Sequence, residues 1–255
     1  MERTVLSAQE VVEYEEFKRS RREAEIAVTL KRLIVDCSRR ESDKAQIRRA
    51  CESAKKLGAS AVLVSPVNVS LARRLLEGSR VEIVCLTGGT GESLPVIKKT
   101  EAKKACAQGA REVRLVPCYS ALVGGNLSYL KKEIKKVRRA AKRGTVTLSL
   151  EDHALGEEEV ALGVRAAREA GAQGVCVRGE TSLVLRAIEA GADKLRIDVS
   201  GVENSEQLKS VVRAGALRVT SGNGERIAGE LYERAQRESY VTPAAKPAPV
   251  PEPKA

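Results

Sequence analysis

The chain has 255 residues and a formal net charge of +11, with 42% hydrophobic but only 2% aromatic residues. This length is enough for one large α/β domain or two small ones, and the core must here be built from aliphatic side chains. The shortage of aromatic stacking surfaces argues against a single-stranded nucleic-acid binder, whereas the positive charge leaves other anionic partners open.

Cysteine and histidine are too scattered to form a metal site. The six cysteines include no Cys-X-X-Cys pair, and His153 is the only histidine. Because a zinc site needs clustered ligands, we expect neither a metal nor a cofactor. The opening residues are charged throughout, and no apolar run is long enough for a membrane span. We therefore expect a cytoplasmic protein with free thiols and no membrane contact.

The first 30 residues are predicted to form a charged N-terminal helical extension, with one or two amphipathic helices over 7–30. A barrel domain is predicted over 31–238. Within it, Gly-Ala pairs follow helical stretches and precede short apolar runs, which indicates repeated helix-to-strand transitions ended by a left-handed glycine. These pairs are Gly58-Ala59, Gly109-Ala110, Gly171-Ala172, Gly191-Ala192 and Gly215-Ala216.

Apolar runs and helical periodicity then alternate along the chain. The predicted strands are 31–36, 61–65, 81–86, 113–117, 145–150, 174–178, 194–198 and 217–220. Predicted helices include 43–57, 98–108, 127–142, 157–170, 183–190, 206–214 and 225–237. Eight βα units in this length predict a closed (β/α)8 barrel with a parallel sheet. An open doubly wound sheet is the alternative, but no G-x-G-x-x-G follows the first strand. The last segment, 239–255, is rich in Pro and Ala and is predicted to be disordered.

Alternation along the strands places several charged side chains inside the barrel. The inward set is predicted to comprise Asp36, Arg114, Thr147, Ser149, Glu151, Cys176, Arg178, Lys194, Arg196, Asp198, Arg218 and Thr220. One interpretation is a set of internal ion pairs, with Asp198 paired to Arg178 or Arg218 rather than to Arg196. The other is an anion site, since guanidinium groups suit phosphate or carboxylate.

The loops after the last two strands are the best candidates for phosphate binding. Small residues there let backbone N–H groups approach an anion at a helix N-terminus, a common phosphate position in barrels. The candidate residues are Ser200, Gly201, Gly222, Asn223 and Gly224, with Arg178 as a clamp. Val202 is expected to narrow the first of these loops. A plain helix-capping turn is the alternative interpretation.

Three further features are candidates for a functional role. Glu151 and His153, at the end of the fifth strand, are weak acid–base candidates. Cys176 is either a nucleophile or a buried small side chain. The basic helix 127–143 is either a solvated face or, like the tail 239–255, a contact surface for a partner.

Several segments, in the right order, resemble the 2-deoxyribose-5-phosphate aldolase family over roughly residues 31–230. The stretch AVLVSPVNVSLARRLLEGSRVEI is similar to the family's second-strand region, and TEAKKACAQGAREVRLV, ALVGGNLSYLKKEIKKV and LSLEDHALGEEEV match later segments. Asp36 in VDCS resembles the first-strand D-H-T segment. The resemblance implies a (β/α)8 barrel, a class I aldolase ancestry and a homo-oligomer.

The departures from the family pattern lie where the family does its chemistry. The family's Schiff-base lysine falls on Cys176 in GVCVRGE, and its second lysine falls on Asp198 in DVSGV. The fourth-strand aspartate falls on Arg114 and the fifth-strand lysine on Thr147. Because an imine needs an unprotonated amine, the resemblance implies the fold but not the aldolase reaction.

From these features we expect a barrel that has lost aldolase chemistry and binds a phosphorylated small molecule or a protein partner. A lysine-independent lyase or isomerase acting on a sugar phosphate is one alternative, and a scaffold or assembly protein is the other.

Overall fold

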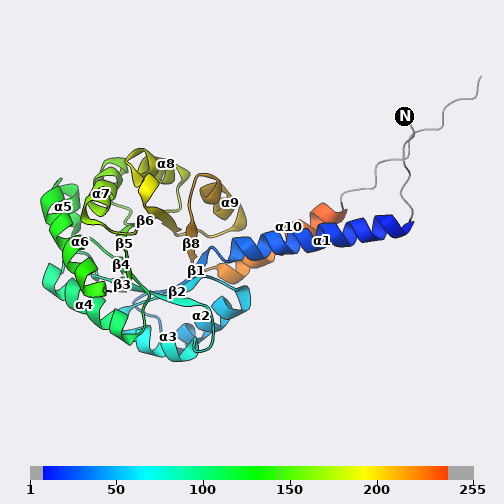
Figure 1. Ribbon diagram of the computed structural model, residues 1–255, viewed down its shortest axis with the longest axis horizontal. Coiled ribbons are helices and arrows are strands. Elements are labelled where there is room, and N and C mark those ends of the chain that lie inside the picture. Colours follow the sequence, from blue (N-terminus) through cyan, green and yellow to red (C-terminus); the bar gives the residue numbers. More distant parts are fainter. Residues whose placement is uncertain (1–7, 143, 241–255) are drawn as a thin grey trace, which may run out of the picture.

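A computed structural model describes residues 8–142 and 144–240. Its centre is a closed barrel of eight parallel strands that pair in chain order, with β1 closing against β8. The predicted (β/α)8 fold is therefore confirmed (Figure 1). The strands are β1 Leu33–Cys37, β2 Ala61–Val64, β3 Glu82–Thr87, β4 Glu112–Leu115, β5 Thr145–Leu150, β6 Gly174–Arg178, β7 Arg196–Ser200 and β8 Arg218–Ser221.

Helices surround the barrel and cover the outer faces of its strands (Figure 1). The α-helices are α1 Ala8–Leu30, α2 Lys44–Leu57, α3 Val69–Leu75, α4 Pro95–Gln108, α5 Tyr119–Val123, α6 Leu127–Ala141, α7 Glu157–Ala170, α8 Thr181–Glu189, α9 Ser205–Arg213 and α10 Gly224–Tyr240. Two short 3-10 helices lie at η1 Pro66–Asn68 and η2 Ala192–Lys194.

Local sequence signals explain where the helices begin and end. Asp43 and Gln46 form a capping box at the start of α2, and Gly58 ends that helix in the left-handed region with a φ of 64°. The glycine of every Gly-Ala pair has a positive φ, as the helix-to-strand reading predicted. The recurring pair therefore marks the junctions of the βα units.

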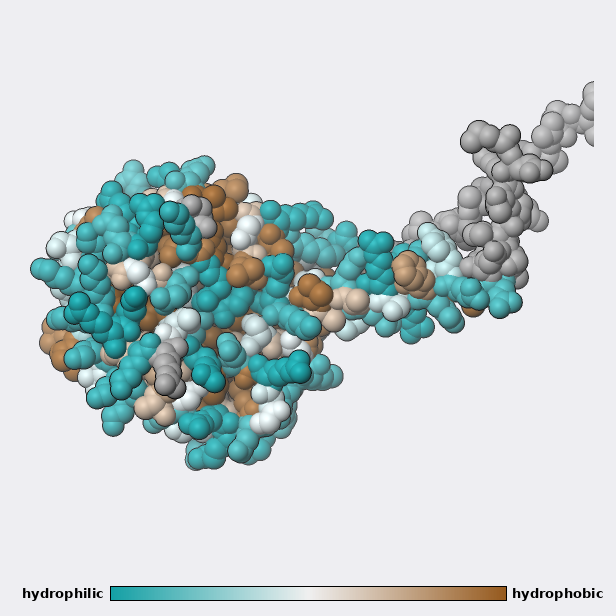
Figure 2. Space-filling view, viewed as in Figure 1, coloured by the Kyte–Doolittle hydropathy of each residue, from teal (hydrophilic) through white to brown (hydrophobic). Residues whose placement is uncertain are grey.

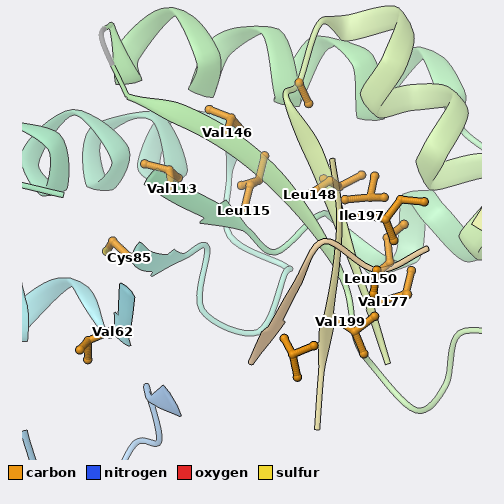
Figure 3. Close-up of a cluster of buried hydrophobic side chains, with 14 of the residues drawn as sticks. Val62, Cys85, Val113, Leu115, Val146, Leu148, Leu150, Val177, Ile197 and Val199 are labelled. Carbon is orange, nitrogen blue, oxygen red and sulfur yellow. The ribbon is translucent and has the colours of Figure 1, made fainter. Parts of the chain in front are cut away.

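The main core lies between the strands and the surrounding helices (Figure 3). Outward residues such as Val113, Leu115, Leu148 and Val199 are completely buried there. Burying these branched and aliphatic side chains is the main stabilising contribution expected for a chain with so few aromatic residues.

The structure corrects the start of the seventh strand. We predicted that Lys194 would begin it and face inward, but Lys194 ends η2 and is exposed, and β7 begins at Arg196. The apolar–polar alternation extends back to Lys194 in the sequence, while the chain there forms a 3-10 turn before it enters the sheet. The inward register of Arg196 and Asp198 is unaffected.

The N-terminal extension is one long helix, α1, which lies beside α10 (Figure 1). Together they project from the barrel as an arm, with mixed hydrophilic and hydrophobic atoms on its surface (Figure 2). The helix α10 continues to Tyr240, past the predicted end at 237, and residues 241–255 of the predicted tail lie outside the described residues. No helix within 8–142 and 144–240 is long and apolar enough to cross a membrane.

Candidate functional site in the barrel

The barrel interior has one apolar side, formed by β1, β2 and β3. Ile34, Ala61, Leu63 and Val84 are buried together, and Leu86 packs against them. Asp36 continues the inward row of β1 toward the carboxyl end of the barrel, where its Oδ1 accepts hydrogen bonds from the N–H and hydroxyl of Ser38. This side of the interior resembles the packed centre of an ordinary barrel.

The other side of the interior, formed by β4 to β8, contains a network of buried charges. The carboxylate of Glu112 accepts hydrogen bonds from Arg196 Nη2 at 2.7 Å and from Arg218 Nη2 at 2.7 Å. The carboxylate of Asp198 accepts from Arg196 Nε at 3.1 Å and from Arg218 Nε at 3.1 Å. The two arginines therefore bridge the same two acids, so that each buried charge has partners of opposite sign.

The pairing of Asp198 was predicted only in part. Arg218 does bind it, but Arg196 binds it too, which we had excluded because the two residues lie two positions apart on one strand. The long arginine side chain extends along β7 to reach the carboxylate two positions further on. Arg178, the other predicted partner, instead donates to the carbonyls of Asp152 and Leu155.

The arginines keep Asp198 ionised despite its burial. Burial alone would raise the pKa of this carboxyl, but hydrogen bonding and charge from Arg218, together with Arg196 and Arg114, lower the pKa below its ordinary value. A carboxylate held in this way is not a proton donor near neutral pH. It occupies the position that the family resemblance assigns to a lysine.

Arg114 lies deeper in the interior and is completely buried. Its Nη1 donates to Thr220 Oγ1 at 2.9 Å and lies 3.7 Å from Glu151 Oε1, while its Nη2 lies 3.7 Å from Asp198 Oδ2. Its Nε and Nη2 have no hydrogen-bond partner among the described residues. Arg114 is thus the least satisfied charge in the network.

Cys176 faces inward on β6 and is completely buried, paired in register with Asp198. Burial raises the pKa of its thiol well above the ordinary value, and the lowering effect of Arg114 does not reverse that. A nucleophilic cysteine needs the opposite shift. The interpretation of Cys176 as a buried small side chain is therefore favoured over the nucleophile.

None of the eight strands contains a lysine. Among the described residues, the one buried lysine is Lys98, which lies outside the barrel between α4 and α6. Its Nζ donates to Glu133 Oε1 at 2.6 Å and to the carbonyls of Gly91 and Val116. This ammonium is completely buried and is held by three acceptors.

The acid–base candidates do not form a pair. Glu151 is half-buried and accepts a hydrogen bond from Ser149 Oγ at 2.8 Å. His153 lies exposed in the turn after β5, and no hydrogen bond or ion pair to its ring is found among the described residues. The structure shows Glu151 directed to the arginine network rather than to His153.

The loop between β8 and α10 borders a cavity of about 690 Å³. Gly222, Asn223 and Gly224 line it on one side. Its charged lining consists of four cations, Arg39, Arg49, Lys56 and Arg226, and three acids, Asp36, Glu52 and Glu225. Since α10 begins at Gly224, the first N–H groups of a 17-residue helix are directed to this end of the loop. The four cations were not predicted from the sequence. Three of them belong to α2 and the loop before it, which lie far from Gly222–Gly224 along the chain.

The other proposed phosphate residues lie beside that loop but outside the cavity lining. Ser200 pairs in register with Thr220, and Gly201 follows it with a φ of 73° and no atom within 4 Å of an added Cβ. Val202 does not narrow the loop as expected, because its side chain is buried in the core beneath the helices. Arg178 is bonded to Glu180 and to the loop after β5, and does not line the cavity.

The basic helix α6 uses part of its charge in contacts with neighbouring segments. Lys131 pairs with Glu169 on α7 at 2.7 Å, and Arg138 donates to the carbonyl of Gly171. Its acid, Glu133, is buried against Lys98, so it does not offset the charge of the exposed face. A partner for this face stays a prediction.

Comparison with known proteins agrees with the resemblance seen in the sequence. No family model matches the chain. It is 33% identical over 189 residues to a deoxyribose-phosphate aldolase of Clostridium perfringens, covering 70% of this chain and 84% of that protein. It is 31% identical over 197 residues to one of Bdellovibrio bacteriovorus, covering 72% of this chain and 88% of that protein.

Solved structures show the same fold. An aldolase described as QR15 superposes with a TM-score of 0.76 at 24% identity, over 82% of this chain and 98% of its own. The tetrameric deoxyribose phosphate aldolase of Aeropyrum pernix gives a TM-score of 0.76 at 19% identity, over 90% of this chain and 100% of its own. With relatives above 30% identity matched over most of their length, the chain belongs to the deoxyribose-phosphate aldolase family.

Proposed function

We propose that this member of the family has lost Schiff-base aldolase chemistry and binds a phosphorylated small molecule at the carboxyl end of the barrel. The observation that supports the loss is the arginine-bound Asp198 beside the buried Cys176, in strands that contain no lysine. A Schiff base needs an amine that can lose its proton inside the site. Thiol, carboxylate and guanidinium groups do not supply one.

The binding half of the proposal depends on the loop before α10. Backbone N–H groups at the start of that helix favour an anion, and the surrounding cations of the cavity add charge-assisted contacts. In this proposal Gly222, Asn223 and Gly224 hold the phosphate, and Ser200 and Gly201 border it. Arg178 would act as a clamp by exchanging the carbonyls of Asp152 and Leu155 for the ligand.

The catalytic half is tested with 2-deoxyribose 5-phosphate as substrate. We expect no retro-aldol turnover above buffer and no mass increase after borohydride treatment in its presence. Cys176→Lys alone should not restore activity, because the new ammonium would lie beside the ionised Asp198, and an opposite charge keeps an amine protonated. Turnover that borohydride with substrate abolishes would overturn the loss of aldolase chemistry.

The binding half is tested by thermal shift with inorganic phosphate and a panel of sugar phosphates. Ligands that bind the folded state raise the melting midpoint. Gly222→Val should abolish the shift, because its side chain would keep an anion away from the backbone N–H groups of the loop. The variant should still fold, since Gly222 is exposed, has no strained φ and has no atom within 4 Å of an added Cβ. Gly229→Val is the matched control, since Gly229 lies on α10 with equally open surroundings.

The variants also separate the clamp from the loop. A weaker phosphate shift in Arg178→Ala supports the clamp, whereas an unchanged shift assigns Arg178 to the loop after β5 alone. If phosphate and sugar phosphates leave the melting midpoint of the wild-type protein unchanged, the proposed anion site is wrong, and a scaffold role becomes the favoured function.

A further inference from the structure

The face of α1 that points away from α10 has apolar residues at the spacing of a coiled coil. Tyr14, Phe17, Ala24 and Val28, with the charged Arg21 at the middle position, recur at alternating intervals of three and four. We call these five residues the α1 stripe. Phe17 is 63% exposed, Val28 57% and Tyr14 54%. Residues at this spacing normally form the seam of two packed helices, and here nothing in the described chain covers them.

The opposite face of α1 accounts for its packing within the chain. Ile26 and Leu30 are buried in the core, and Arg19 and Ile26 line a cavity shared with Tyr232 of α10. Although α1 lies beside α10 (Figure 1), the α1 stripe stays open, since Tyr14, Phe17 and Val28 are each more than half exposed. The helix thus has one satisfied face and one unpartnered face.

The charges along α1 identify what would cover the stripe. The segment 13–16 has three acids and no base, and the segment 18–22 has four bases and no acid. Of these bases, Arg19 and Arg22 line the cavity toward α10, whereas Arg21 lies in the α1 stripe. Phe17 lies between them. An antiparallel second copy centred on Phe17 would place the acidic segment of each helix beside the basic segment of the other, whereas a parallel copy would place like charges together.

We propose that the protein self-associates through the α1 stripe, with two α1 helices packed antiparallel about a two-fold axis at Phe17. This contact is independent of the anion site. Glu13 of one copy then lies level with Arg21 of the other. The present partners of these bases, such as Glu25 for Arg21 and Glu15 for Lys18, are exposed pairs on the same helix, which contribute little and can exchange.

The length of the arm makes room for both barrels. Leu30, where α1 meets the barrel core, lies 13 residues from Phe17, or about 20 Å at 1.5 Å per residue. In the antiparallel arrangement the two barrels lie at opposite ends of the paired arms. Each α10 stays on the outer side of its own α1, so the contact needs no rearrangement of the chain.

Sedimentation velocity of the full chain at tens of micromolar and low salt tests the contact. Phe17→Glu should weaken self-association through the α1 stripe and raise the dissociation constant of that contact at least tenfold. Val67→Glu is the matched control, because Val67 is 86% exposed on the barrel and lies in η1, far along the chain from α1. Unchanged melting midpoints check that both variants fold. A wild-type monomer, or association that Phe17→Glu leaves intact, would overturn the proposal.

Orientation is tested by disulfide trapping. The antiparallel arrangement places residue 14 of one copy near residue 20 of the other, so mixed Tyr14→Cys and Ser20→Cys proteins should cross-link more than either protein alone. The wild-type protein, whose described cysteines are buried or half-buried, gives the background. Efficient cross-linking of Tyr14→Cys with itself would mean parallel helices and would overturn the antiparallel contact.

Discussion

The two sides of the barrel interior are built on different principles. On β1 to β3, aliphatic side chains such as Ile34 and Leu63 fill the space, as in most barrels. On β4 to β8, two acids and two arginines fill it through shared hydrogen bonds. The charges are tolerated because they are gathered on adjacent strands, where each one reaches partners of opposite sign.

The two sides also differ in how they respond to the loss of a carboxylate. Asp198→Ala should lower the free energy of unfolding by about 4 kcal/mol, because the half-buried Arg196 and Arg218 would share only the carboxylate of Glu112, and the completely buried Arg114 would lose a facing charge. Asp36→Ala, on the apolar side, removes two hydrogen bonds from Ser38 and should cost about 1 kcal/mol. Urea unfolding at neutral pH measures both. Equal losses would mean that the network is not what holds the charged side.

The apolar side should respond to lost volume instead. Leu63→Ala should lower the free energy of unfolding by about 3 kcal/mol, since Leu63 is almost completely buried and its removal leaves a cavity. Unlike the loss in Asp198→Ala, this loss should not depend on pH or salt. Urea titrations at low and high salt measure it. A loss that changes with ionic strength would show that the two sides are coupled.

The pH dependence of stability isolates the charge of Asp198. Its pKa in the folded protein is lowered, so its charge stabilises the fold above the unfolded pKa of about 3.9. That contribution is lost as the pH falls through the lower folded value. The difference in unfolding free energy between wild type and Asp198→Asn should be constant above about pH 5 and shrink in acid. A difference that grows in acid would contradict the lowered pKa.

The sequence predicted the architecture well because its signals are local. Glycine stops after helices and alternating residues in strands depend on neighbours within a few positions, and both survived in the structure. The charge network depends on distant residues. Glu112 was missed because it lies one position before the predicted start of its strand. The Arg196–Asp198 contact was predicted not to form because the two residues follow each other along one strand, but an arginine side chain is long enough to bend over that spacing.

The site beside α10 was predicted in the same incomplete way. The small residues of Gly222 to Gly224 are a local pattern and were found. Two of the cations that line the cavity with them, Arg49 and Lys56, come from α2, about 170 residues earlier in the chain. Closure of β1 against β8 brings the two segments together. No local sequence pattern in either segment predicts that contact.

The smallest predicted effect compares two threonines inside the charged side. Thr147 Oγ1 donates to Glu112 Oε1 at 2.8 Å and accepts from Arg196 Nη2, but both partners keep other hydrogen bonds without it. Thr220 Oγ1 accepts from Arg114 Nη1, and this is the one hydrogen bond found for the Arg114 guanidinium among the described residues. The two hydroxyls therefore differ in redundancy rather than in burial.

Replacing each threonine by valine removes the hydroxyl and little volume. Thr147→Val should lower the free energy of unfolding by about 1 kcal/mol, the usual contribution of one hydrogen bond. Thr220→Val should cost about 2 kcal/mol, because it leaves a buried guanidinium without an acceptor. Urea unfolding under identical conditions compares the pair. If Thr147→Val lowers the free energy of unfolding more than Thr220→Val does, the network depends on the Thr147 hydroxyl. The acids and arginines that share partners would then not be what stabilises the charged side.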